Sequence, residues 1–209
     1  MSNRHITLFH AIPSRSSGVL TLLEELGADY ELKLLDLRAG DNLKPEYLAI
    51  NPMGKVPAIL HDGALVTEQV AIFIYLGDLY AETGLAPQMG DPLRGPYLRW
   101  LAFHGSCFEP ALIDKALKRE PAPRGMSPFV DADTVMQVIE GQLSAGEYLL
   151  GARFTVADVL WGSALGWLVG FGLVQATPVI EAYLARVMAR PAVTRARQID
   201  AGLSGNTPG

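Results

Sequence analysis

The chain has 209 residues, of which 49% are hydrophobic and 19% charged, a composition typical of a folded globular protein. Its formal net charge is −5, and lysine and arginine form no basic run, so we expect no nucleic-acid partner. A single cysteine, Cys107, excludes an intramolecular disulfide and fits a reducing compartment, so we expect a cytoplasmic location.

The first part of the chain alternates strand and helix patterns. Residues 6–9 predict a strand, and a helix follows whose apolar positions are Val19, Leu20, Leu22, Leu23 and Leu26. Gly27 is expected to end this helix, and residues 30–35 predict a second strand. Because a helix separates them, the two strands are expected to lie parallel.

A hairpin and a third helix complete the predicted N-terminal domain. Asp62 and Gly63 suit a tight turn between strands over 56–60 and 65–67. A helix over 68–80 follows directly. Residues 1–80 are therefore expected to form an α/β domain in the order βαβ then ββα.

The second half of the chain shows helical periodicity only. Residues 81–92 contain Gly and Pro with little apolar periodicity, which is typical of a linker. Helices are then predicted over 93–119, 129–146, 155–174 and 178–189, and Pro191 is read as a breaker after the last turn. We expect an all-helical domain over 93–209.

One helix of this second domain is unusually apolar. Residues 159–174 carry no charge, but the stretch is shorter than the roughly 20 residues that a membrane span needs. We therefore expect no membrane association and a helix buried in the core. Thr155 and Asp158 have the spacing of a capping box at its start, with a catalytic role for Asp158 as the alternative.

Four motifs occur in the order found in the cytosolic glutathione transferase family, and together they resemble its bacterial serine-type or theta- and beta-like members. They are Leu-Glu-Glu-Leu-Gly at 23–27, Gly-Lys-Val-Pro at 54–57, the Glu-led helix from 67–72, and the capping box at 155–158. The resemblance covers nearly the whole chain. It implies a thioredoxin-like N-terminal domain, a helical domain forming the second-substrate side of the cleft, glutathione as co-substrate, and a homodimer. No metal is expected, because the four histidines form no pair at ligand spacing.

The resemblance also implies which residues bind glutathione, namely Ser14, Lys55, Val56, Pro57, Glu68 and Gln69. Val56-Pro57 matches the family's cis-proline turn, where the Val56 main chain would pair with the cysteinyl backbone of glutathione. Glu68 would accept from the ligand's ammonium at a helix start that suits a carboxylate. Gln69 departs from the family, which more often has Ser there. Lys55 would lie near the glycyl carboxylate, or else on a solvated loop.

The resemblance implies that the residue that meets the glutathione sulfur, a Tyr, Ser or Cys in the family, lies between the first strand and the first helix. Residues 1–29 contain no Tyr or Cys, so a hydroxyl or a guanidinium must take this role. Counting back from the motif at 23–27 places a serine-type hydroxyl at Ser16 and a beta-type cysteine position at Arg15. Ser14 is also within reach, so Ser16, Ser14 and Arg15 are the catalytic candidates, and Ser17 stays open as a fourth contact to the sulfur. A serine here can instead cap the helix.

Four residues of the first long helix of the second domain are candidates for an apolar second-substrate pocket: Trp100, Phe103, His104 and Phe108. Core packing or dimer packing is the alternative for the same residues. Cys107 lies at helical spacing from Phe103 and is expected to be a small buried residue.

The function implied is a glutathione transferase that activates the glutathione thiolate for attack on hydrophobic electrophiles or peroxides, in detoxification. Isomerisation and dehalogenation remain open, because substrate choice depends on side chains that the sequence does not place. The rival hypothesis is a non-catalytic scaffold or ligand-binding protein that keeps the fold. Retention on immobilised glutathione with a lowered thiol pKa would distinguish the two.

Overall fold

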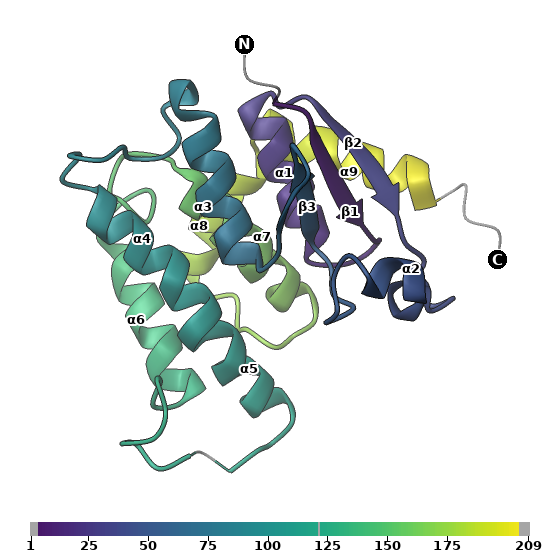
Figure 1. Ribbon diagram of the computed structural model, residues 1–209. Coiled ribbons are helices and arrows are strands. Elements are labelled where there is room, and N and C mark those ends of the chain that lie inside the picture. The colour runs from purple at the N-terminus through teal and green to yellow at the C-terminus, as the bar shows by residue number, and fades with distance from the viewer. Residues whose placement is uncertain (1–3, 121, 205–209) are drawn as a thin grey trace. The chain divides into compact units, whose positions relative to one another are not determined.

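The computed structural model describes residues 4–120 and 122–204 (Figure 1). These residues form two compact units. Residues 4–83 and 189–204 make the first unit, and residues 84–188 make the second.

The first unit contains a four-stranded sheet in the order β2-β1-β3-β4. Its strands are β1 (Ile6–His10), β2 (Tyr30–Leu34), β3 (Ala58–His61) and β4 (Ala64–Val66). β1 runs parallel to β2, and β3 is antiparallel to both β1 and β4. The parallel pair and the hairpin around Asp62-Gly63 are confirmed, each within about two residues of the predicted bounds.

The helices of the first unit are α1 (Ser16–Leu26), α2 (Pro45–Leu48), α3 (Gln69–Leu79) and α9 (Pro191–Ser204), with short 3-10 turns at Asp41–Leu43 and Ala81–Thr83. α1 buries its apolar residues and ends at Gly27, as predicted. Gly27 takes the left-handed conformation (φ 60°), and its N–H donates to the carbonyl of Leu23. The fold is the predicted thioredoxin-like βαβ-ββα unit with one additional helix.

α9 is the element that the sequence did not predict, and it belongs to the first unit and not to the helical one. Pro191 starts this helix instead of breaking the chain, because the first helical position needs no N–H donor. α9 runs beside α1 (Figure 1). The Arg190 guanidinium makes two hydrogen bonds to the Glu25 carboxylate, at 2.5 and 2.8 Å, and Arg195 pairs with Glu24 at 2.6 Å.

The second unit consists of helices, apart from two isolated β-bridges within residues 148–153. They are α4 (Arg94–Phe103), a π-helical turn (His104–Phe108), α5 (Glu109–Ala116), α6 (Ala132–Ser144), α7 (Val156–Gly170) and α8 (Pro178–Met188). The predicted all-helical character is confirmed. Within the described ranges, no helix is both long and apolar enough to cross a membrane.

α7 is the buried helix of this unit, and its start is fixed by the predicted capping box. The Asp158 carboxylate accepts hydrogen bonds from the Thr155 and Leu149 N–H groups, both at 2.9 Å, and from the Tyr183 hydroxyl at 3.1 Å. Asp158 is fully buried, and this burial raises its pKa. These contacts give Asp158 a structural role, so the catalytic alternative is not supported.

Candidate functional site

The candidate site begins at the serine loop, which we define as residues 13–17; they follow β1 and include the first two residues of α1. Ser14 is half-buried, Arg15 is exposed and Ser16 is fully buried. The Ser14 hydroxyl accepts a hydrogen bond from the Ser16 N–H at 3.1 Å, so it satisfies one backbone donor at the start of α1. The N-cap position of α1 is Arg15, whose side chain makes no capping hydrogen bond.

Ser16 occupies a polar position inside the first unit. Its Oγ lies 2.8 Å from His10 Nδ1 and 2.7 Å from Ser14 Oγ. It also accepts from the Ala11 N–H at 3.1 Å and lies 3.2 Å from the Ala11 carbonyl oxygen. A hydroxyl that is fully buried among these partners does not face a ligand. The prediction that Ser16 is the leading candidate for the sulfur contact is therefore not supported, and Ser14 is the more accessible hydroxyl.

Two further residues of this cluster, His10 and Asp200, were not found by the sequence analysis. His10, at the end of β1, is fully buried, and its Nε2 lies 2.9 Å from Asp200 Oδ1 on α9. The Ser17 hydroxyl donates to Asp200 Oδ2 at 2.7 Å. The available signal was an acidic residue at helical spacing from the apolar positions Ala196 and Val193, on a helix that we did not predict.

The second part of the site is the turn before β3. The Val56–Pro57 peptide is cis, which confirms the prediction, and a second cis bond precedes Pro13. Pairing between β3 and β1 ends at Ala58, so Val56 lies just beyond the ladder. Pro57 is buried and Val56 half-buried.

Hydrogen bonds fix the backbone that leads into this turn. The Lys55 carbonyl accepts from the Tyr47 hydroxyl at 2.6 Å and from the Asn51 amide at 2.9 Å, while the residue itself is exposed. Gly54 has φ 59°, and a Cβ there would lie 2.8 Å from the Asn42 carbonyl oxygen. The turn is therefore held rigidly and only glycine fits at position 54.

The third part is the start of α3. Glu68 is exposed and has φ 62°, a conformation that is unusual for a residue with a side chain and that is enriched at functional sites. Gln69, the first residue of α3, donates from its amide to the Arg15 carbonyl at 3.2 Å. This hydrogen bond joins the start of α3 to the serine loop.

The four predicted second-substrate residues lie together in an aromatic cluster with Trp161 in the second unit. Phe108 and Trp161 have ring centroids 4.7 Å apart, and the Trp161 indole N–H donates to the Trp100 carbonyl at 3.0 Å. Trp100, His104 and Phe108 are buried, which favours the packing alternative for these three. Phe103 is half-buried, and so is Cys107.

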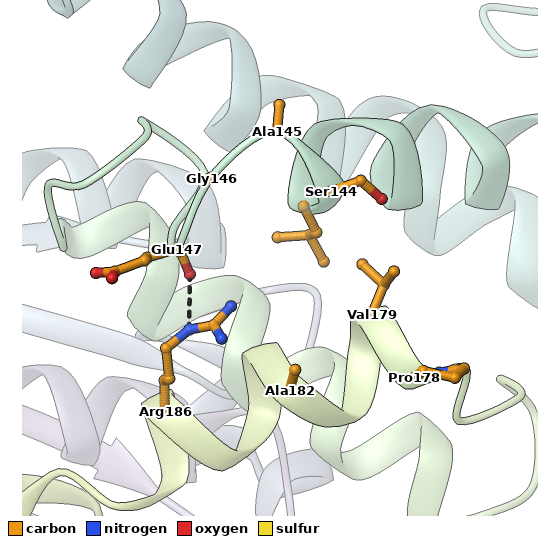
Figure 2. A pocket seen from close by; sticks show the side chains of 9 residues that line it. Ser144, Ala145, Gly146, Glu147, Pro178, Val179, Ala182 and Arg186 are labelled. Atoms are coloured by element: carbon orange, nitrogen blue, oxygen red, sulfur yellow. Dashed lines mark hydrogen bonds between the residues drawn. The ribbon is translucent and has the colours of Figure 1, made fainter.

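A surface pocket of about 500 Å³ also occurs in the second unit, between the end of α6 and the first turns of α8 (Figure 2). Its lining is mainly apolar, and the Arg186 guanidinium donates to the Glu147 carbonyl at 3.0 Å at its edge. It contains none of the predicted site residues.

The titratable residues of the described chain show no cluster that could hold a metal ion.

Comparisons with known proteins bear on both units. The chain matches the family descriptions "Glutathione S-transferase, N-terminal domain" over residues 4–78 and "Glutathione S-transferase, C-terminal domain" over residues 126–191. It is 31% identical to the Escherichia coli glutathione S-transferase GstA over 180 residues, which cover 82% of this chain and 87% of that protein. It is 29% identical to a Hyoscyamus muticus glutathione S-transferase, covering 85% of this chain and 90% of the relative.

Solved structures give the same result. A glutathione transferase from Methylococcus capsulatus superposes with a TM-score of 0.77 at 31% identity, covering 94% of this chain and 98% of the other. A sphingomonad glutathione S-transferase complexed with glutathione superposes with a TM-score of 0.77 at 29% identity, covering 93% and 98% of the two chains.

Proposed function

This chain belongs to the cytosolic glutathione S-transferase family, and we propose that it is a glutathione transferase that holds its co-substrate as a thiolate for attack on a hydrophobic electrophile or peroxide. Both family domains match, and the relatives are named as transferases. The sphingomonad relative is described as complexed with glutathione. The non-catalytic scaffold is not favoured by these similarities.

The observation that carries the proposal is the hydrogen bond from the Gln69 amide to the Arg15 carbonyl. It fixes the start of α3 against the loop that holds the accessible Ser14 hydroxyl. A ligand that spans the two would meet a helix N-terminus at one end and a hydroxyl at the other. Glutathione has a carboxylate for the first and a sulfur for the second.

The remaining contacts follow from the chemistry of the tripeptide. The exposed Glu68 carboxylate would accept from the γ-glutamyl ammonium, and the first N–H groups of α3 would bind the adjacent carboxylate. The Val56 main chain, just beyond the sheet ladder before cis Pro57, would pair with the cysteinyl residue. The exposed Lys55 ammonium would offset the glycyl carboxylate.

We assign the sulfur contact to Ser14, with exposed Arg15 as supporting positive charge. A hydroxyl donor and a nearby cation both stabilise a thiolate relative to a thiol. A free thiol with a pKa of about 8.5 is ionised to only a few per cent at neutral pH, and a pKa of about 7 would raise this to roughly half. The lowered pKa increases the concentration of the nucleophilic thiolate. The reaction needs no covalent intermediate with the enzyme.

Three properties of the family are part of the same proposal: assembly as a homodimer, a cytoplasmic location and a role in detoxification. For the apolar second substrate, the half-buried Phe103 is the remaining candidate contact on the second unit.

A titration of the thiolate absorbance of bound glutathione tests the proposed function. We expect the bound thiol to titrate well below the free tripeptide, and Ser14→Ala to move the bound pKa back toward the free value. Ser106→Ala, which removes an exposed serine of the second unit, is the control and leaves the titration unchanged. Absence of binding, or an unshifted thiol pKa in the unsubstituted protein, would refute the transferase proposal.

A further inference from the structure

We propose that a buried chain of hydrogen bonds, from Ser14 through Ser16 and His10 to Asp200, is a proton relay that takes the proton from the glutathione thiol. The proposal rests on the proposed function and deepens it, because it says where the thiol proton goes. His10 and Asp200 would then be positioning residues that act on the sulfur through the two serines.

The relay has four members and an unbroken series of short distances. Ser14 Oγ lies 2.7 Å from Ser16 Oγ, which lies 2.8 Å from His10 Nδ1. His10 Nε2 lies 2.9 Å from Asp200 Oδ1, and Ser17 donates to the other oxygen of the same carboxylate at 2.7 Å. Ser16 and His10 are fully buried, the Asp200 side chain is 19% exposed, and Ser14 is half-buried. The Ser14 end lies in the loop that the Gln69–Arg15 hydrogen bond joins to the start of α3, where the ligand is proposed to bind.

The hydrogen-bonding capacity of each group fixes one arrangement with a neutral imidazole. A carboxylate only accepts, so His10 Nε2 carries a hydrogen toward Asp200 and Nδ1 is an acceptor. Ser16 then donates to Nδ1, in preference to the Ala11 carbonyl at 3.2 Å, and accepts from the Ala11 N–H and from Ser14. Ser14 accepts from the Ser16 N–H, and its second lone pair is left to accept from a thiol.

A second arrangement, with a protonated imidazole, satisfies every group equally well. His10 Nδ1 now donates to Ser16, Ser16 donates to Ser14, and Ser14 donates outward to a thiolate. The two arrangements are interconverted by proton transfer along the chain of hydrogen bonds. The S–H bond breaks, its proton passes to Ser14, the Ser14 proton passes to Ser16, and the Ser16 proton passes to His10 Nδ1. The products are a thiolate and an imidazolium, and both hydroxyls are regenerated.

The Asp200 carboxylate makes this transfer favourable, since it stabilises the imidazolium that forms. Within the described part of the chain, Asp200 is the titratable side chain in hydrogen-bonding distance of His10. On the side of β2, the Leu35 N–H donates to the His10 carbonyl at 2.8 Å. After the sulfur has bonded to the electrophile, the proton returns through Ser16 and Ser14 to solvent.

Anchoring of α9 does not account for this cluster. Two arginine–glutamate pairs already hold this segment to α1: Arg190, directly before α9, with Glu25, and Arg195 of α9 with Glu24. A buried imidazole–carboxylate pair costs desolvation that an apolar pair of the same size would avoid. The buried His10–Asp200 pair is therefore better explained by transfer of the thiol proton than by anchoring of α9.

The test compares His10→Asn and Asp200→Asn with the control Arg195→Gln. Asparagine can still hydrogen-bond at either position, but it cannot accept the proton at 10 or supply the charge at 200. We expect kcat/KM with chlorodinitrobenzene at neutral pH to fall about 10- to 100-fold in both relay variants, with the bound thiol pKa moved toward the free value. Arg195→Gln removes an α9 contact outside the relay and should leave both quantities within about twofold of the unsubstituted protein.

Binding of S-methylglutathione, which lacks the thiol proton, separates the relay from the binding site. Its Kd should stay within about twofold in all three variants, because the relay acts only on the proton. If glutathione binds with a lowered thiol pKa but His10→Asn and Asp200→Asn leave that pKa unchanged, the relay is refuted and the proposed function stands. If glutathione does not bind the unsubstituted protein, the proposed function itself fails.

A measurement on the unsubstituted protein covers the case in which a variant does not fold. The ¹⁵N chemical shifts of the His10 ring report its protonation directly. Glutathione should convert His10 to the imidazolium at a pH where S-methylglutathione leaves it neutral. Equal spectra with the two ligands would overturn the relay.

Discussion

Ser14 and Ser16 lie two positions apart at the start of α1 but have different surroundings, and this difference decides their roles. Ser14 is half-buried and can face a ligand, whereas Ser16 is enclosed by His10 and by the main chain of Ala11. The spacing in the sequence favoured Ser16 over Ser14 for the sulfur contact, because it carries no information on burial. Their burial depends on the side chain at the end of β1, which no local pattern reveals.

Substituting each serine separates its effect on stability from its effect on activity. Ser16→Ala removes a partner of the buried Ala11 N–H and of His10, so the free energy of unfolding should fall by roughly 1–3 kcal/mol. Ser14→Ala should cost less stability but should raise the pKa of bound glutathione. Urea unfolding together with the thiolate titration checks both. A larger loss of stability in Ser14→Ala than in Ser16→Ala would contradict this assignment.

Glu68 combines a strained backbone with a proposed ligand contact. At φ 62° glycine is favoured, so Glu68→Gly should raise the free energy of unfolding by about 1 kcal/mol. It should also weaken glutathione binding at least about tenfold, because the carboxylate is lost. Glu68→Ala is the matched control, since it loses the carboxylate but keeps the strain. Calorimetric Kd values and urea unfolding should therefore show equal loss of binding in both variants but added stability only in the glycine variant.

At the scale of the element, α7 shows how one helix start organises the second unit. The Asp158 carboxylate receives backbone and hydroxyl donors from three segments of the chain. Asp158→Ala would leave these buried donors without their acceptor, so we expect the free energy of unfolding to fall by roughly 2–4 kcal/mol. The folded fraction should keep its glutathione affinity, which calorimetry at low temperature can measure.

The glycines of this unit differ in the space around them. A Cβ on Gly162 of α7 would lie 2.5 Å from Val187 Cγ1 on α8, so Gly162→Ala should destabilise the protein by about 1–3 kcal/mol. Gly141 in α6 has open space around it, and Gly141→Ala should stabilise by about 0.5–1 kcal/mol through helix propensity. Thermal unfolding of the two variants should shift in opposite directions; a shift of the same sign would contradict the close packing of α7 on α8.

Most helices and strands could be predicted from the sequence. The contacts between side chains far apart in the sequence could not. The sheet, its hairpin and the capping box depend on local residue types, and each was found, while the cis turn at Val56–Pro57 was implied by the family resemblance and is also present. α9 was missed because a proline after a helix looks the same whether it ends one helix or starts the next. The contact between His10 and Asp200 joins residues 190 positions apart, and a single sequence contains no information on that pairing.

For the whole molecule, half-buried carboxylates with lowered pKa values contribute to the response to acid. Hydrogen bonds from the Leu93 N–H and from Arg153 lower the pKa of Asp91, and the Thr134 N–H and hydroxyl lower that of Asp131. Because the folded pKa lies below the unfolded value, the stabilisation is present above the usual Asp value of 3.8 and is lost as the pH falls below it.

Urea unfolding between neutral pH and pH 3 should therefore show a decline that begins near pH 4. Asp91→Asn should weaken the pH dependence over this window, since one titrating group is removed. An unchanged slope in this variant would mean that Asp91 is not linked to folding. Asp158 acts in the opposite sense, because burial raises its pKa and favours the folded state at low pH.

The first unit is assembled from two stretches of chain that the ribosome makes at different times. Residues 4–83 emerge first, then the entire second unit, and only afterwards the helix that brings Asp200 to His10. During synthesis the first unit therefore stays incomplete, and the α1 surface that α9 later covers is exposed to solvent. The Val56–Pro57 turn can form before the second unit is translated. The contact between His10 and Asp200, on which the proposed relay depends, can form only after α9 has been translated.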